Sequence, residues 1–228
     1  MIQITPDRVI IEDSQLARLR AEYKERRCVI LPRFLGPSLC DHLIRKLEVA
    51  KFVTKFEVSE ASGQFGQTLF VPETETAFFL FQLLLNRPAL FQAVREITGC
   101  SPIGHFLGRL HRSSPGLQHQ IDWHEDHGVQ RLVGISISLS REAYTGGLFQ
   151  LREKRSEQVL CVIGQLPIGD AFLFDIDPDF QHRLTLVEAG GERTVGVGWF
   201  HSVEAWPTFA RDYLLPGRRH SDSHQPEI

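Results

Sequence analysis

Apolar residues recur at helical spacing in several segments of the first hundred positions. From Glu12 to Arg27 they fall three or four residues apart among charged residues, which predicts an amphipathic surface helix. Gly36-Pro37-Ser38 is typical of a helix start and predicts a second helix, and a third helical block spans about Thr76 to Thr98. Pro88 is expected to split that block, and Gly99 is expected to end it.

Beyond Gly99 the pattern changes to short β-rich runs divided by Gly, Pro and charged turns, which is typical of an all-β sandwich or barrel. An earlier segment, Cys28–Pro32, also predicts a short strand. The later runs are Ile103–Leu110, Val129–Leu139, Gly147–Leu151, Val159–Ile163, Ala171–Phe174, His182–Val187 and Arg193–His201.

A glycine-rich stretch, Ser62-Gly63-Gln64-Phe65-Gly66-Gln67, lies between the helical segments. It has too little apolar periodicity for a regular element. Two interpretations stay open, namely a mobile lid over a functional site and an ordinary surface connection.

The length of 228 residues suits a single domain. We expect residues 1–99 to form a mainly helical N-terminal support, residues 100–205 a β core, and residues 206–228 a C-terminal extension with a flexible end. The apolar share of 42% and the charged share of 23% are typical of a soluble globular protein, which disfavours disorder and coiled coil. A net charge of −3 without a basic run predicts no nucleic-acid partner.

The cysteines show no C-x-x-C spacing, so the sequence predicts buried thiols in a reducing compartment and no disulfide framework or zinc cluster. They are Cys28, Cys40, Cys100 and Cys161. The longest apolar segment, Ala77 to Leu85, is too short to span a bilayer, and the N-terminus has no secretory signal pattern. We therefore expect no membrane association and a cytoplasmic location.

The candidate chemistry lies in Trp123-His124-Glu125-Asp126, taken together with His182. In an extended segment, His124 and Asp126 would point from the same face, because strand side chains repeat every second residue. Two imidazoles and one carboxylate on one face of a metal leave three adjacent positions open, as in non-haem Fe(II) oxygenases. Zinc uses the same ligand types, and satisfied polar residues in a barrel are the alternative without a metal.

Arg193 lies eleven residues after His182, at the start of an apolar run expected to be a buried strand. A buried guanidinium requires an anionic partner. That partner is either a bound anion or a carboxylate of a structural ion pair.

Several motifs resemble, in order and separation, those of the Fe(II)/2-oxoglutarate-dependent dioxygenase superfamily, particularly its prolyl-hydroxylase-like and phytanoyl-hydroxylase-like branches. The resemblance covers most of the chain, because Val29–Leu35 followed by a helix also matches the family's usual N-terminal part. The matching segments are Trp123–Asp126, Gly146–Leu151, Ile168–Phe174, His182–Val187 and Gly191–Phe200.

This resemblance implies an α+β fold with a mainly β core, a cupin-like double-stranded β-helix (jelly roll) with N-terminal helices packed on its outer face. It further implies that His124, Asp126 and His182 bind Fe(II) and that Arg193 pairs with the distal carboxylate of 2-oxoglutarate. With O2 as the other co-substrate, such enzymes release succinate and CO2 and hydroxylate an unactivated C–H bond, with ascorbate as a reductant that keeps iron reduced. The retained Asp126 favours hydroxylation over halogenation.

The chain departs from the family pattern at two places. Many relatives have a tyrosine on the strand before H-x-D that contacts 2-oxoglutarate, whereas here His111 is the candidate for that role. Many also have Arg-x-Ser on the last strand, where this chain has Arg193-Thr194-Val195. The supporting hydroxyl must therefore come from elsewhere or be missing.

The favoured function is a dioxygenase acting on a small molecule, an amino acid or a short peptide. A protein side-chain hydroxylase of the same fold is the second hypothesis. The third, from another class, is a metal-binding or sensor jelly roll without turnover.

Overall fold

An antiparallel sheet of 11 strands dominates the computed structural model, in which residues 1–59, 63–128 and 130–202 are described. The helices are α1 (Asp13–Arg26), α2 (Pro37–Val49), α3 (Thr76–Leu85) and α4 (Pro88–Thr98). The strands are β1 (Ile2–Ile4), β2 (Val9–Ile11), β3 (Cys28–Leu31), β4 (Val53–Ser59), β5 (Gly63–Phe70), β6 (His105–Ser113), β7 (Ile121–His124), β8 (Arg131–Ser138), β9 (Tyr144–Gly146), β10 (Phe149–Glu153), β11 (Val159–Ile163), β12 (Ala171–Phe174), β13 (Phe180–Leu184), β14 (Val187–Gly190) and β15 (Arg193–His201).

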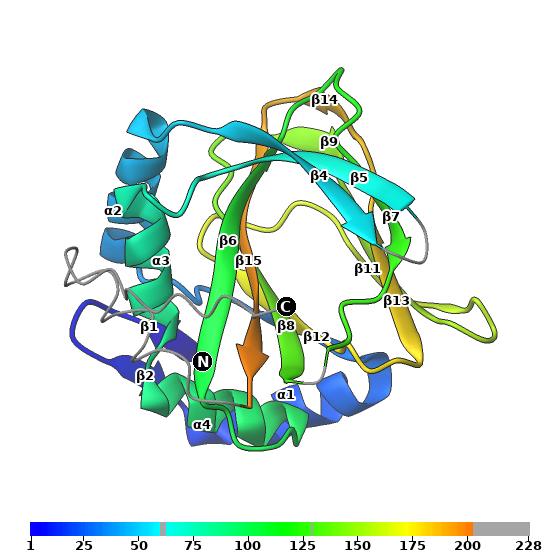
Figure 1. Ribbon diagram of the computed structural model, residues 1–228. Coiled ribbons are helices and arrows are strands. Elements are labelled where there is room, and N and C mark those ends of the chain that lie inside the picture. Colours follow the sequence, from blue (N-terminus) through cyan, green and yellow to red (C-terminus); the bar gives the residue numbers. More distant parts are fainter. Residues whose placement is uncertain (60–62, 129, 203–228) are drawn as a thin grey trace, which may run out of the picture.

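The large sheet curls into a nearly closed barrel with helices against one side (Figure 1). Its strand order is β11-β10-β13-β7-β5-β6-β15-β8-β12-β3, and β4 pairs with β5. The predicted mostly β jelly roll with helices on its outer face is confirmed. The predicted break at Pro88 and stop at Gly99 are also present, because Pro88 begins α4 and Gly99 caps it with a φ of 75°.

The two faces of β15 have different surroundings, because one lines the interior of the barrel and the other packs against the helices. Alternation along β15 sends Arg193 and Trp199 into the barrel, where both line a pocket, while Phe200 is buried in the core shared with α3 and α4. A Cβ at Gly196 would meet the Phe81 ring at 2.4 Å. Glycine at this position therefore lets α3 approach the sheet closely.

β11 and β3, the first and last strands in the order of the large sheet, are joined by a disulfide between Cys28 and Cys161. The prediction that all four cysteines are thiols is therefore wrong for this pair, while Cys40 and Cys100 are free. Spacing in sequence did not reveal the pair because 133 residues separate its members, and the barrel's curvature brings them together. The expectation of a cytoplasmic location rested partly on four buried thiols, and this disulfide removes that support.

The first 99 residues contain the four helices and also contribute strands. In particular, β4 and β5 form a hairpin that enters the barrel between β7 and β6. The predicted extension over residues 206–228 lies outside the described residues. No single described helix has the length and apolarity to cross a membrane, and only the bent pair α3 and α4 meets that test jointly.

Candidate metal centre

The two histidines of the candidate site are direct cross-strand neighbours. In the antiparallel pair of β13 and β7, His182 lies opposite His124, and their ring centroids are 4.2 Å apart. The Nδ1 of His124 donates to the carbonyl of Asp122 at 2.7 Å, which leaves Nε2 directed at Asp126. A second partner on one ring nitrogen is the usual way to orient a metal-binding imidazole.

Asp126 lies just beyond the end of β7, so its position does not follow from strand alternation as the sequence argument assumed. Other contacts fix it. The indole Nε1 of Trp199 donates to Oδ2 of Asp126 at 2.8 Å, and Nη1 of Arg131 donates to its carbonyl at 3.2 Å. The Oδ2 atom is 3.2 Å from Nε2 of His182. The sequence analysis did not predict this orienting role of Trp199.

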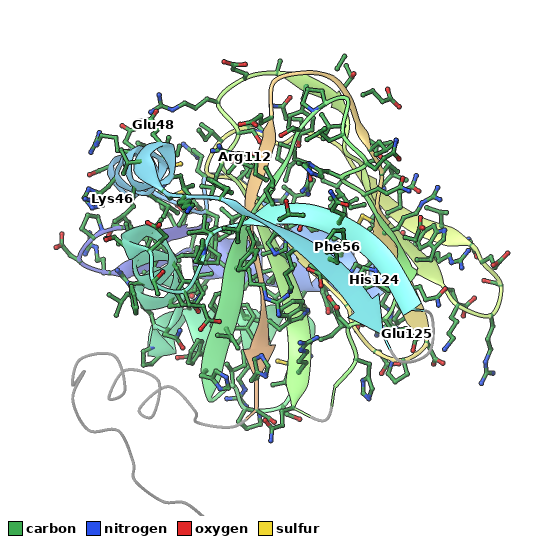
Figure 2. The ribbon with its side chains drawn as sticks, turned by 45° about the horizontal axis from the view of Figure 1, so that its top comes forward. Lys46, Glu48, Phe56, Arg112, His124 and Glu125 are labelled. Atoms are coloured by element: carbon green, nitrogen blue, oxygen red, sulfur yellow. A yellow bond between two sulfur atoms is a disulfide. The ribbon has the colours of Figure 1, made fainter. Side chains whose placement is uncertain are left out.

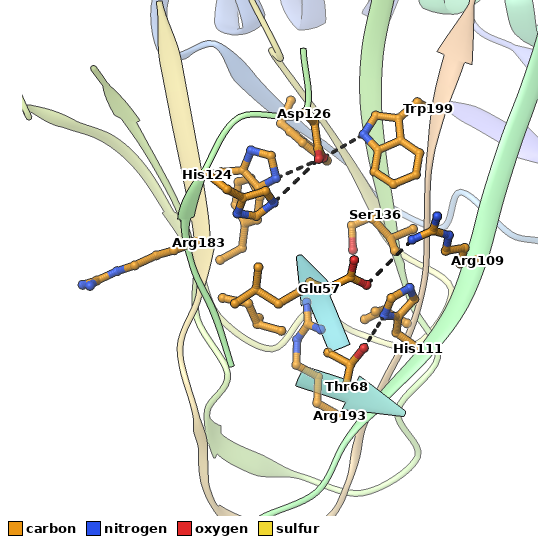
Figure 3. Close-up of a pocket in the computed structure, with 17 residues that line it drawn as sticks. Glu57, Thr68, Arg109, His111, His124, Asp126, Ser136, Arg183, Arg193 and Trp199 are labelled. Carbon is orange, nitrogen blue, oxygen red and sulfur yellow. Dashed lines mark hydrogen bonds and ion pairs between the residues drawn. The ribbon is translucent and has the colours of Figure 1, made fainter. Parts of the chain in front are cut away.

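The donor atoms of His124, Asp126 and His182 all lie within 4.8 Å of one another, a separation compatible with a shared ion (Figure 3). Burial lowers the pKa of His124 to about 4, aided by repulsion from His182. Burial alone would raise the pKa of Asp126, but the adjacent His182 and His124 and the Trp199 hydrogen bond hold it well below its usual range. At neutral pH His124 is neutral and Asp126 ionised, the states that metal binding requires.

Arg193 lies in the same pocket, and its guanidinium is buried. Burial lowers its pKa, whereas a hydrogen bond to Tyr144 raises it. No carboxylate of the described residues forms an ion pair with Arg193 within 4.0 Å. Because a buried cation without an anion is costly, this arrangement fits an anionic ligand better than the structural ion pair that was the alternative.

His111 also faces this pocket, and its Nε2 is a buried nitrogen without a hydrogen-bond partner. Its Nδ1 lies 3.0 Å from the hydroxyl of Thr68. Burial lowers the pKa of His111 to about 3, with Arg109 the next cause, so the ring is neutral. When the Thr68 hydroxyl donates to Nδ1, Nε2 carries the proton and is free to donate to a ligand.

The hydroxyl that the Arg-x-Ser position lacks is available from other strands. Thr194 points to the outer side, where its Oγ1 accepts from Arg112. Thr68 on β5 and Ser136 on β8 both line the pocket, and Tyr144 contacts Arg193 directly. These residues were not predicted, because nothing in their local sequence marks them.

The β4–β5 hairpin supplies Thr68 and Glu57 to the pocket. The expectation that residues 62–67 form no regular element is wrong from Gly63 onward, since Gly63–Phe70 is a strand; residue 62 lies outside the described part. Gly66 serves packing, because a Cβ at this position would meet the carbonyl of Gln120 beside β7 at 2.7 Å.

Trp123, which directly precedes His124, lies on the outer side of the barrel. The guanidinium groups of Arg152 and Arg183 lie 4.2 and 4.7 Å from its ring centroid. Arg183 points away from the centre of the pocket in Figure 3, and its Nε donates to Gln150. Although Trp123 directly precedes a candidate ligand in sequence, its ring therefore packs against arginines and not beside the metal ligands.

No protein-family model and no curated protein matches this chain. Solved structures do match. A 2OG-Fe(II) oxygenase family oxidoreductase from Burkholderia pseudomallei is 17% identical with a TM-score of 0.59, covering 85% of this chain and 93% of its own. The chain has the fold of the 2OG-Fe(II) oxygenases.

Two further solved structures extend this likeness. A Trichoplax adhaerens prolyl hydroxylase, in complex with a hypoxia inducible factor peptide fragment, is 15% identical with a TM-score of 0.55, covering 84% of this chain and 94% of its own. The epimerase SnoN, in complex with Fe3+, alpha ketoglutarate and nogalamycin RO, is 13% identical with a TM-score of 0.58, covering 95% of each chain. The predicted superfamily resemblance is thus confirmed in the fold.

Proposed function

We propose that this protein is an Fe(II)- and 2-oxoglutarate-dependent dioxygenase. The observation that carries the proposal is one pocket lined by the His124–Asp126–His182 cluster and by a buried Arg193 without a carboxylate partner among the described residues. The cluster fits a divalent metal, and Arg193 fits an anion. A 2-oxo dicarboxylate is the kind of ligand that would satisfy both.

The chain's own residues have distinct tasks in this proposal. His124, Asp126 and His182 would hold Fe(II), which would supply open positions for 2-oxoglutarate and O2 and the chemistry of C–H oxidation. Trp199 fixes the carboxylate of Asp126 by its hydrogen bond. Because Asp126 is ionised at neutral pH, no proton has to leave it when the metal binds.

Arg193 would bind the distal carboxylate of 2-oxoglutarate with two parallel hydrogen bonds. His111 would add a donor through Nε2, and Thr68 would fix the tautomer of that imidazole. Apolar side chains line the pocket between these polar groups and limit water access. They are Phe149, Phe174, Leu184, Val195 and Val197.

The reaction we propose is hydroxylation of a C–H bond in a small molecule, an amino acid or a short peptide. The retained Asp126 supports hydroxylation over halogenation. The peptide bound by the Trichoplax prolyl hydroxylase and the small-molecule ligand of SnoN both lend support to such substrates. A protein side-chain hydroxylase remains the second candidate.

The test is O2-dependent formation of succinate from 2-oxoglutarate by anaerobically Fe(II)-loaded protein, across a panel of amino acids and peptides. Wild type should turn over, His124→Gln should not, and Arg193→Gln should need about 100-fold more 2-oxoglutarate, equivalent to ~2.7 kcal/mol of lost binding. His127→Gln is the matched control, since His127 is exposed and outside the cluster. Binding of 2-oxoglutarate that does not depend on metal or Arg193 would contradict the proposal and favour a non-catalytic protein.

A further inference from the structure

Four charged side chains at or near the pocket contact neither the proposed iron nor the co-substrate, although one of them, Arg131, also donates to the carbonyl of Asp126. We call Lys55, Glu57, Arg109 and Arg131 the mouth cluster. The Nζ of Lys55 is 3.2 Å from Oε1 of Glu57, and Nη1 of Arg109 is 3.7 Å from the same oxygen. The Arg109 and Arg131 side chains are 38% and 33% exposed, whereas Arg193 is only 7% exposed, so the cluster lies toward solvent.

Strand alternation places Glu57 and Arg109 in the pocket, and Lys55, two residues before Glu57 on β4, lies on the same face of its strand. Glu57 lines the pocket, whereas Phe56 beside it is exposed on the other face of the hairpin (Figure 2). On β6, Arg109 and His111 are two residues apart and both line the pocket. In Figure 3 the Glu57 carboxylate points toward Arg109 in the interior.

The mouth cluster lies beside the candidate metal centre. The guanidinium of Arg131 is 4.1 Å from the Trp199 ring centroid, and that of Arg109 is 5.8 Å from it. Arg131 also approaches Oδ1 of Asp126 to 3.8 Å. A group bound by Arg109 and Arg131 would therefore lie close to the candidate metal ligand Asp126.

Positive charge exceeds negative charge in this cluster. Three cations face one carboxylate, Glu57, while Asp126 is shared with the proposed metal. Burial lowers the pKa of Lys55, and repulsion from Arg109 and Arg131 lowers it further, although Glu57 opposes this. The cations thus crowd one another, and an incoming anion would relieve that repulsion.

We propose that the mouth cluster binds an anionic group of the substrate, a carboxylate or a phosphate, with Lys55, Arg109 and Arg131 as its ligands. The substrate class is then an acidic small molecule or an acidic peptide. Glu57 holds Lys55 and Arg109 in place and weakens binding by competing for them. This inference rests on the proposed function, because it takes the anion's carrier to be the oxidised substrate.

The test uses trifluoroacetate as an anionic probe and trifluoroacetamide as its neutral match, followed by fluorine NMR. The protein is loaded with Zn(II), which supports no turnover, and with saturating 2-oxoglutarate to occupy Arg193. Arg109→Gln should weaken trifluoroacetate binding about five- to tenfold, as expected for loss of a charged hydrogen bond. Glu57→Gln should strengthen it about threefold or more, and Arg152→Gln, on the outer side of the barrel, should leave it unchanged.

Opposite effects of the two mouth-cluster variants would support the proposal, and stronger displacement by inorganic phosphate than by acetate would identify a phosphate rather than a carboxylate site. Equal binding of trifluoroacetamide, or equal effects of Arg109→Gln and Arg152→Gln, would overturn it. The same titration in Arg193→Gln protein without 2-oxoglutarate separates the two claims. Probe binding that persists in this variant would not depend on Arg193 or on 2-oxoglutarate. If the probe binds in this way but wild type does not bind 2-oxoglutarate, only the proposed function is refuted.

Discussion

The strands that carry the candidate ligands and the hairpin between them contribute differently to one pocket. β13 and β15 present His182, Arg193 and Trp199 from strands that are paired along both sides, and β7 presents His124 from a strand paired with β13. The hairpin β4–β5 inserts between β7 and β6, yet β5 pairs with β7 only at Gly66 and Ile121. It presents Glu57 and Thr68, which contact the co-substrate pocket and its mouth. This difference suggests a fixed metal centre combined with a hairpin that sets ligand preference.

The largest effect is expected from a change to one of the candidate metal ligands. Asp126→Asn keeps the shape of the side chain and removes its charge, so we expect metal affinity to fall by more than about 100-fold, above the cost typical of changing groups that only orient ligands. Calorimetric titration with Fe(II) under anaerobic conditions measures this change. His127→Gln is the control, and similar affinities for both variants would contradict a metal site at Asp126.

The second prediction concerns the disulfide and tests whether covalent closure of the barrel stabilises the strands that carry the candidate ligands. Cys28 and Cys161 join the first and last strands in the order of the large sheet, and β11 reaches β13 through β10. Cys161→Ser should lower the free energy of unfolding by about 2–4 kcal/mol in urea denaturation. Cys100→Ser removes a free thiol instead. If reducing agent leaves the stability of wild type unchanged, the covalent closure does not contribute.

Trp199 tests how strongly Asp126 is held by its neighbour. Trp199→Phe retains an aromatic ring and removes the 2.8 Å hydrogen bond to Oδ2. We expect about tenfold weaker metal binding, since groups that orient ligands contribute this much. Trp123→Phe on the outer barrel surface should have no such effect. Equal losses in the two variants would show that the indole acts through general stability.

Thr68 tests the contribution of the hairpin, and the expected effect is the smallest. Thr68→Val removes the hydroxyl next to Nδ1 of His111, so 2-oxoglutarate affinity should fall about threefold to tenfold while metal affinity stays unchanged. Thr54→Val, an exposed change on β4, provides the control. A loss of metal affinity in Thr68→Val would break the proposed division between the two regions.

The sequence was sufficient where signals were local. The start of α4 at Pro88, the cap at Gly99 and the strand Ala171–Phe174 match their predicted positions. The triad and Arg193 were identified by motif, and the register of β7 against β13 then brings the two histidines together. Their roles as ligands remain predictions that the experiments above address.

The hairpin was missed for a physical reason. The usual strand pattern has apolar residues facing inward, but β4 directs Glu57 into a polar pocket and exposes Phe56. β5 contains glycine where it approaches β7, which weakens its periodicity further. The disulfide was missed because only the closed barrel brings its cysteines together. Sequence patterns thus reveal elements built for a core more readily than elements built for a site.

The most direct test of the central claim is anaerobic titration of 2-oxoglutarate into wild type and Arg193→Gln protein, each with and without Fe(II). The account predicts binding that requires Fe(II) and that is about 100-fold weaker in Arg193→Gln, because the buried guanidinium supplies the anion contact. Binding of equal strength in all four samples would contradict it, since neither the metal nor Arg193 would then take part.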